Sequence, residues 1–234
     1  MIFSSVSGKN WIFKKFDPND VEKFTENYAL TEIAAKLLSI RKKNIEDIKL
    51  FLEPKIKNLL PNPLHLKDMK RGIERIYKSI TSKETIAIFG DYDVDGASST
   101  AILTRYFLSI NQKVKTYIPD RQKEGYGPSI EGFTFLIDQG AKIIFTVDCG
   151  TLAFEPIKVA QNLNIDVIVL DHHQSDTRLP KAHAIINPNR YDDTSGLNYL
   201  CAAGVCFVFL AGLNKKLRDE NWFRRIFEMA RISR

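Results

Sequence analysis

The sequence predicts an α/β fold, with a doubly wound, mostly parallel sheet preceded by a helical N-terminal segment. From residue 84 onward, apolar segments of strand length alternate with amphipathic segments of helix length, which is typical of a parallel sheet covered on both faces. The first strand leads into three aspartates, at the place where open α/β sheets bind ligands. We expect an N-terminal helical segment over residues 1–83 packed on the core, the α/β core over 84–200, and a helical segment over 201–234.

The composition is that of a globular protein. The chain has 234 residues, of which 44% are hydrophobic, enough for one sizeable domain or two small ones. No stretch reaches the length of a membrane span, and the N-terminus lacks the features of a signal peptide. Three cysteines without zinc-like spacing indicate a reducing compartment, so we expect a cytoplasmic protein with no membrane partner. The net charge of +6 fits an anionic partner such as nucleic acid, or simply a solvated basic face.

The N-terminal segment is expected to be helical and to carry little chemistry. Pro18 marks a helix start, and Thr31 and Asn44 are candidate N-caps. Two prolines break the chain within 60–64, and an amphipathic helix follows over 69–80. We interpret the basic residues of this region as a solvated face, with contacts to a phosphate backbone as the alternative: Lys67, Lys70, Arg71, Arg75 and Lys78.

From residue 84 onward, the sequence is expected to form five strands and four helices, the last helix lying in the segment 201–234. The apolar, largely β-branched segments predict strands over 85–89, 113–118, 142–147, 166–170 and 184–187. The amphipathic segments predict helices over 98–108, 129–139, 152–163 and 202–214.

The three aspartates after the first strand, Asp91, Asp93 and Asp95, are best explained by a bound cation. Carboxylates this close repel one another, and a cation neutralises them. An EF-hand calcium loop begins with the same spacing, but it requires a preceding helix and a glutamate at the twelfth position, where this chain has Ile102. An acidic surface turn fits poorly with so apolar a preceding strand.

Polar residues also follow two further strands. Asp148 follows the third expected strand, and Asp171, His172 and His173 follow the fourth. Because parallel strands end at one edge of a sheet, these side chains are expected to converge with the first aspartates. Oxygen and imidazole ligands suit manganese or magnesium, and two such ions clamp the oxygens of a phosphoryl displacement. A single aspartate is more often an N-cap and a lone histidine pair more often polar surface, but three strand ends together favour a metal site.

The motifs in this order resemble the DHH phosphoesterase superfamily: Asp91-Tyr92-Asp93-Val94-Asp95-Gly96, Val147-Asp148-Cys149-Gly150 and Asp171-His172-His173. Within it, the chain is most similar to the bacterial RecJ exonuclease family. The further motifs are Ile118-Pro119-Asp120-Arg121, Glu124-Gly125-Tyr126-Gly127, Ile186-Asn187-Pro188-Asn189 and Ala202-Ala203-Gly204-Val205. The likeness covers roughly residues 25–225.

The resemblance implies a single-stranded-DNA-specific 5′→3′ exonuclease that hydrolyses phosphodiester bonds with Mn²⁺ or Mg²⁺, two ions filling the complete family site. It implies four metal ligands, with Asp148 as the natural bridge between the ions: Asp93, Asp95, Asp148 and His172.

The same resemblance implies catalytic and substrate-binding roles. His173 is expected against the scissile phosphate, with Asp91 supporting the ligands and Asp171 behind them. The residues expected to bind substrate are Arg121, Tyr126 and Gly127.

The sequence departs from the family in three places. Phe89 stands where many relatives carry a histidine, which some close relatives also lack. Nothing after Asn214 resembles the family's further metal-binding aspartate, and the family's later domains are not recognised. We therefore expect a truncated, impaired member whose partners are single-stranded DNA and either a complementing C-terminal fragment or DNA-repair proteins.

Two alternative functions stay open. A DHH phosphodiesterase acting on short oligonucleotides, cyclic dinucleotides or polyphosphate would keep the chemistry, although the N-terminal helices and segment 118–127 favour the exonuclease. A non-catalytic remnant that binds single strands or a partner is the other, and the missing aspartate favours it. Metal-dependent release of nucleotides distinguishes the remnant from the enzymes.

Overall fold

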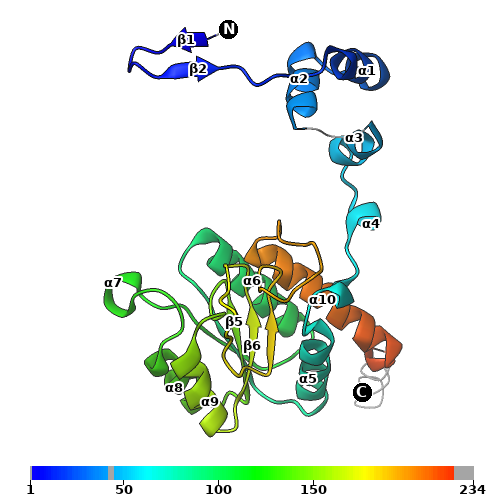
Figure 1. Ribbon diagram of the computed structural model, residues 1–234. Helices are drawn as coiled ribbons and strands as arrows, with labels where there is room; N and C mark the ends of the chain where they lie inside the picture. Colours follow the sequence, from blue (N-terminus) through cyan, green and yellow to red (C-terminus); the bar gives the residue numbers. More distant parts are fainter. Residues whose placement is uncertain (1, 42–44, 224–234) are drawn as a thin grey trace. The chain divides into compact units, whose positions relative to one another are not determined.

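Figure 1 shows the computed structural model, which describes residues 2–41 and 45–223. The chain divides into two compact units between Leu60 and Pro61. The helix over Met69–Thr81 (α5), which we had placed in the N-terminal segment, belongs to the second unit. In the ranges that the structure describes, no helix is both long enough and apolar enough to cross a membrane.

In the residues that the structure describes, the first unit has a short hairpin and four helices: β1 (Ile2–Ser4), β2 (Asn10–Ile12), α1 (Pro18–Tyr28), α2 (Glu32–Ile40), α3 (Ile45–Leu52) and α4 (Ile56–Leu59). The antiparallel hairpin stands where the sequence predicted a helix. Its turn uses Gly8 at φ 74°, a conformation that glycine adopts without a steric cost. Three-residue strands are too short to show a clear periodicity, which explains the missed prediction.

One expected helix start, at Pro18, and one expected N-cap, Thr31, are confirmed. Asp17 precedes Pro18 and accepts a hydrogen bond from the backbone N–H of Asn19, and Thr31 accepts one from Ala34. These side chains satisfy amides that have no partner inside their helices. The other candidate N-cap, Asn44, lies outside the described residues.

The second unit is built on a five-stranded parallel sheet in the order β4-β3-β5-β6-β7. The strands are β3 (Ile86–Phe89), β4 (Val114–Tyr117), β5 (Ile143–Val147), β6 (Asp166–Leu170) and β7 (Ala184–Ile186). The helices beside α5 are η1 (Pro63–His65), α6 (Val94–Ser109), α7 (Arg121–Glu124), α8 (Ile130–Asp138), α9 (Phe154–Asn162) and α10 (Ala202–Asp219). The predicted α/β fold is confirmed.

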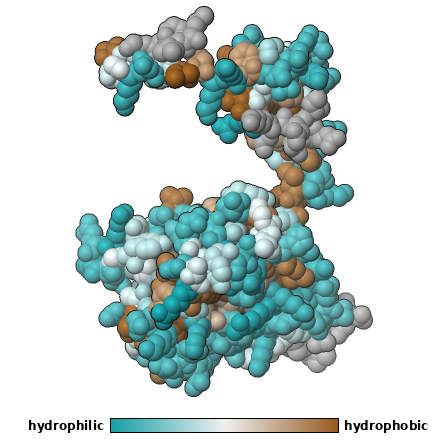
Figure 2. All heavy atoms as spheres, viewed as in Figure 1, coloured by the Kyte–Doolittle hydropathy of each residue, from teal (hydrophilic) through white to brown (hydrophobic). Residues whose placement is uncertain are grey.

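Two apolar layers cover the sheet, one on each face. Ile86 and Ile88 of β3 pack in the layer that contains α5, α6 and α10, whereas Phe89 packs with α8 and α9 on the other face. Figure 1 shows these two groups of helices around the strands, and the face of this unit seen in Figure 2 is mostly hydrophilic. Helices on both faces make the central strands apolar throughout rather than alternating.

The strand order reverses beside β3. The chain passes from β3 to the edge strand β4, and then crosses to β5 on the other side of β3. In such a sheet, a crevice opens at the carboxyl ends of the strands where the order reverses. The loops after β3 and β5 therefore border the natural binding site of this fold.

α6 begins at Val94, before the expected start at Ser98, and this difference affects the aspartates. Asp93 is the N-cap of α6, because its Oδ1 accepts a hydrogen bond from the backbone N–H of Gly96 at 2.9 Å. Asp95 consequently lies in the first helical turn instead of on the loop. Aspartate and glycine have low helix propensity, which concealed this turn in the sequence.

One of the basic residues that we expected on a solvated face, Arg75 of α5, is instead largely buried in an ion-pair network. Its guanidinium contacts Glu84 at 2.8 Å and Asp166 at 2.5 Å, and its own side chain is 12% exposed. The network ties α5 to the chain segments that lead into β3 and β6.

We predict that Arg75→Met lowers the free energy of unfolding by about 1–3 kcal/mol, because two partly exposed carboxylates lose their partner. Urea unfolding measures this change. Lys70→Met, on the exposed side of the same helix, is the matched control and should change stability by less than about 0.5 kcal/mol. Equal effects of the two substitutions would contradict a structural role for the network.

Candidate functional site

The predicted site residues lie at the carboxyl ends of three neighbouring strands, on one edge of the sheet. Asp91 follows β3, Asp148 follows β5, and Asp171 follows β6. The backbone N–H of Asp148 donates to Leu170 of β6 at 3.0 Å, so the loop after β5 continues alongside the neighbouring strand. We call this set of strand ends the catalytic edge.

Two overlapping groups on the catalytic edge have the geometry of cation sites. One group is Asp91, Asp93 and Asp148, the other is Asp148, His172 and His173, and in each group the candidate ligand atoms lie within 4.8 Å of one another. Asp148 belongs to both, and its Oδ1 lies 3.3 Å from Nε2 of His172. The arrangement therefore has one carboxylate shared between two potential ion positions.

The electrostatics of these carboxylates fit a cation. Asp148 is 2% exposed and Asp91 is 3% exposed, and Oδ1 of each has no hydrogen-bond partner within the described chain. Burial, the charge of Asp95 and the contact with Asp93 raise the pKa of Asp148 to about 8. Burial and the charge of Asp93 likewise raise the pKa of Asp91. Buried oxygens without a donor are costly, and divalent cations such as Mn²⁺ and Mg²⁺ prefer oxygen ligands of this kind.

The backbone at Asp148 is strained. Its φ is 60°, in the left-handed region that non-glycine residues occupy at a cost of about 1–3 kcal/mol. The turn is completed by Gly150 at φ 105°, where an added Cβ would lie 2.3 Å from Oγ1 of Thr146. Such strain persists where the surrounding structure enforces it, typically at functional sites.

Asp171 organises the histidine pair. Its Oδ1 accepts hydrogen bonds from the backbone N–H groups of His172 and His173 and lies 2.7 Å from Nδ1 of His173, while its Oδ2 accepts from the N–H and hydroxyl of Thr151. Burial would raise the pKa of Asp171, but the hydrogen bonds from His173 and Thr151 outweigh it and lower that pKa. The hydrogen bond to Asp171 raises the pKa of His173 against the opposing effect of burial.

Asp95, one of the four expected ligands, belongs to neither group. Its two carboxylate oxygens accept hydrogen bonds from the backbone N–H groups of Ala202 and Ala203 at 2.7 and 2.8 Å. Its Oδ2 also lies 3.6 Å from Nε2 of His172, so the side chain borders the catalytic edge while contacting α10.

Tyr126 directly contacts the catalytic edge. Its hydroxyl donates to the backbone carbonyl of Asp148 at 3.2 Å and lies 3.3 Å from Nδ1 of His173. The guanidinium of Arg121 lies 4.8 Å from the ring centroid of Tyr92. Tyr92 stands between the first two aspartates of the cluster in the sequence. Gly127, at φ 85°, shapes the turn after Tyr126 and offers no side-chain contact. Both expected substrate-binding side chains, those of Arg121 and Tyr126, therefore lie at or near the edge.

Two asparagines hold the histidine backbone, and reasoning from the residues alone did not assign them a role. Nδ2 of Asn187 donates to the carbonyl of His173 at 2.9 Å and to the hydroxyl of Thr151 at 2.8 Å, and Nδ2 of Asn189 donates to the carbonyl of His172. The signal in the sequence was the Ile186-Asn187-Pro188-Asn189 motif, which belongs to the family resemblance but was given no role.

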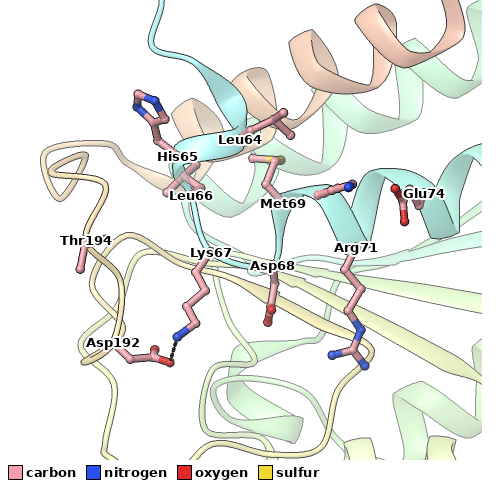
Figure 3. Close-up of a pocket in the computed structure, with 11 residues that line it drawn as sticks. Leu64, His65, Leu66, Lys67, Asp68, Met69, Arg71, Glu74, Asp192 and Thr194 are labelled. Atoms are coloured by element: carbon pink, nitrogen blue, oxygen red, sulfur yellow. Dashed lines mark hydrogen bonds and ion pairs between the residues drawn. The ribbon is translucent and has the colours of Figure 1, made fainter.

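A separate cavity of about 600 Å³ lies beside the N-terminal end of α5 (Figure 3). It shares no lining residue with the two cation-binding groups. Lys67, which lines it, pairs with Asp192 at 2.5 Å, and Lys70 and Arg71 are exposed at its rim. Of the carboxylates that line the cavity, Asp192 is paired with Lys67 and Asp68 with Arg190, which leaves Glu74 outside these ion pairs. One such carboxylate is too few for a cation site, so the candidate site remains the catalytic edge.

Comparison with known proteins identifies the family. The model of the DHH family, N-terminal domain, matches residues 85–230. The chain is 36% identical over 215 residues to the single-stranded-DNA-specific exonuclease RecJ of Bacillus subtilis, covering 92% of this chain and 27% of that protein. It is also 36% identical over 173 residues to RecJ of Escherichia coli, covering 74% of this chain and 30% of that protein. The chain thus spans less than a third of these relatives.

Solved structures of similar fold agree. A crystal structure of exonuclease RecJ bound to manganese has a TM-score of 0.60 and 29% identity, covering 65% of this chain and 38% of that one. The structure of RecJ in complex with Mn²⁺ from Thermus thermophilus has a TM-score of 0.67 over 86% of this chain and 28% of that one. At 24% identity, the second match shows the fold alone.

We predict that Asp148→Asn abolishes tight cation binding at both groups, because it neutralises the carboxylate that they share. Calorimetric titration of Mn²⁺ into the metal-free chain measures stoichiometry and affinity. Asp91→Asn is the matched comparison, since Asp91 belongs to one group only, and it should leave one cation bound. Unchanged binding by Asp148→Asn would contradict a shared ligand.

Proposed function

The chain belongs to the DHH family, and we propose that it is the catalytic portion of a single-stranded-DNA-specific exonuclease, which hydrolyses phosphodiester bonds from the 5′ end with Mn²⁺ or Mg²⁺. The observation that carries the proposal is the buried carboxylate of Asp148, shared by two groups of potential ligands. The curated relatives named above are single-stranded-DNA-specific exonucleases, and the similar RecJ structure at 29% identity contains manganese. Free cysteines, two of them buried, support a reducing cytoplasmic compartment.

The geometry supports two cation positions. Asp93 and Asp148, with Asp91 in support, would hold one ion, and Asp148 and His172 would hold the other, with Asp95 beside it. Divalent cations bound there would supply a Lewis acid that lowers the pKa of water and positive charge that offsets the oxygens of the phosphate. The strained turn at Asp148 holds the shared carboxylate in place before substrate arrives.

His173 would face the scissile phosphate. Asp171 accepts from its Nδ1 and raises its pKa, so the imidazolium form is more populated near neutral pH. A protonated ring at this position would donate a hydrogen bond to a phosphate oxygen and offset the charge that develops during displacement. Asp171 is a positioning residue in this scheme.

The loop that carries Arg121 and Tyr126 would bind the strand. The guanidinium of Arg121 can contact a phosphate in a bidentate manner, and its stacking on Tyr92 places it beside the aspartate cluster. Tyr126 closes the edge next to His173, and the positive φ of Gly127 lets the chain turn away from the strand.

We predict that the chain releases nucleotides from a 5′-labelled single strand in Mn²⁺ and that EDTA abolishes the release. Asp148→Asn should lower the rate by at least about 100-fold, because it removes the shared ligand. A duplex of the same sequence and a set of dinucleotides and cyclic dinucleotides are the comparison substrates. Cleavage of the small substrates alone would favour a different DHH phosphodiesterase, and binding of single strands without cleavage would contradict the proposed enzyme.

We predict that His173→Ala lowers turnover by about 10²–10³ while cation affinity is retained, whereas His172→Ala loses the cation. Asp171→Asn should lower the pKa of His173, because it removes the carboxylate that stabilises the imidazolium. Activity that requires protonated His173 is lost as pH rises through this pKa, so the alkaline limb of the pH–rate profile should move to lower pH. An unmoved limb would contradict the role assigned to the pair.

A further inference from the structure

Asp95 joins two helices that begin far apart in the sequence. It is the second residue of α6, and its carboxylate reaches the first two residues of α10, more than a hundred positions later. Oδ2 accepts from the N–H of Ala202 at 2.7 Å, and Oδ1 accepts from the N–H of Ala203 at 2.8 Å. Both carboxylate oxygens are thus used by one helix end.

This contact replaces a local cap. The residue at the N-cap position of α10, Cys201, forms no side-chain cap hydrogen bond within the described chain. The first amides of a helix need acceptors from outside it, and a negative charge near them is also favoured by the helix dipole. Hydrogen bonds to a carboxylate are shorter and stronger than neutral ones. Asp95 therefore supplies, from another element, what the sequence around Cys201 lacks.

α10 is central to one layer of the fold. It packs against α6 and α5, and its inward side chains Val205, Phe209 and Leu213 are fully buried in the layer that covers the sheet. The first turn of this helix lies beside the catalytic edge, because Asp95 is also 3.6 Å from Nε2 of His172.

We propose that Asp95 is a positioning residue that anchors the first turn of α10 to the catalytic edge, so that the fold requires its charge even when no cation is bound. A carboxylate oxygen has two lone pairs, and the hydrogen bonds to α10 use one on each oxygen. The remaining lone pairs are free to face a cation beside His172. The helix and the cation would then share one carboxylate. This anchoring role stands whether or not the chain is a nuclease.

The stability of the metal-free chain distinguishes an anchor from a simple ligand. Aspartates that only hold a cation repel one another without it, so neutralising one should maintain or raise stability. Asp95→Asn instead places an NH₂ group against the backbone N–H of Ala202 or Ala203, and it removes the negative charge that strengthens both hydrogen bonds. We expect its Tm in EDTA to fall by roughly 3–10 °C. Asp91→Asn, in the same cluster but without contact to α10, is the matched control and should not lower the Tm.

A second variant tests the contact from the other side. Ala202→Pro removes the N–H that donates to Asp95 and changes no charge. Proline is favoured at the first helical position, and Cys201 already has the extended backbone, φ −77° and ψ 171°, that a residue before proline adopts. If the contact is real, the Tm losses of Ala202→Pro and Asp95→Asn are less than additive in the double variant. Full additivity would overturn the proposal.

Amide exchange and NMR locate the effect and keep the proposal testable if Ala202→Pro proves too disruptive. In Asp95→Asn, exchange of the amides at the start of α10 should accelerate at least tenfold. Magnesium added to the unsubstituted chain should shift the Ala202 and Ala203 amide resonances, a response that Asp95→Asn should lose. A Tm of Asp95→Asn that does not fall, unchanged exchange in α10, or a response to magnesium that Asp95→Asn retains would each overturn it.

Discussion

The burial of Asp148 without a donor for one of its oxygens is the constraint on which the rest of the site depends. An unpaired buried carboxylate costs several kcal/mol, and its neighbours Asp91 and Asp93 are acidic as well. A cation or a proton has to offset that cost. The hydrogen bonds to the histidines and their backbone hold imidazole groups where a cation at Asp148 would meet them. The surrounding structure thus favours the ionised carboxylate of Asp148 only when a positive charge lies beside it.

The parallel sheet makes this concentration of charge possible. All five strands end at the same edge, so loops that are distant in sequence meet there without any long insertion. The apolar layers on both faces keep the strands rigid and place their final residues in fixed positions. Asn187 and Asn189 then tie the loop after β7 to the loop after β6, and Asp171 ties the loop after β6 to Thr151 in the loop after β5. Most of the site is therefore held by backbone geometry and by hydrogen bonds to backbone groups rather than by flexible side chains.

The sequence predicted the features that arise from local pattern. Apolar periodicity located all five strands of the sheet, and the rule for parallel strands brought Asp91, Asp148 and Asp171 to one edge. The sequence did not predict individual hydrogen bonds between side chains and distant backbone groups. Nothing near Asp95 indicates an interaction with Ala202, and the lack of a capping side chain at Cys201 does not identify the residue that replaces it. The early start of α6 was missed for a related reason, because the capping hydrogen bond of Asp93 outweighs the poor helix propensity of the residues after it.

The left-handed backbone at Asp148 affects how the site should be probed. Asparagine and glycine adopt a positive φ at little cost, whereas alanine and glutamate do not. A scan that replaces this residue with alanine would therefore combine the loss of a carboxylate with a rearrangement of the turn. The shape of the loop, and not only its charge, limits which residues can occupy the position. Natural variation there should accordingly be restricted to aspartate, asparagine and glycine, even in relatives that bind no metal.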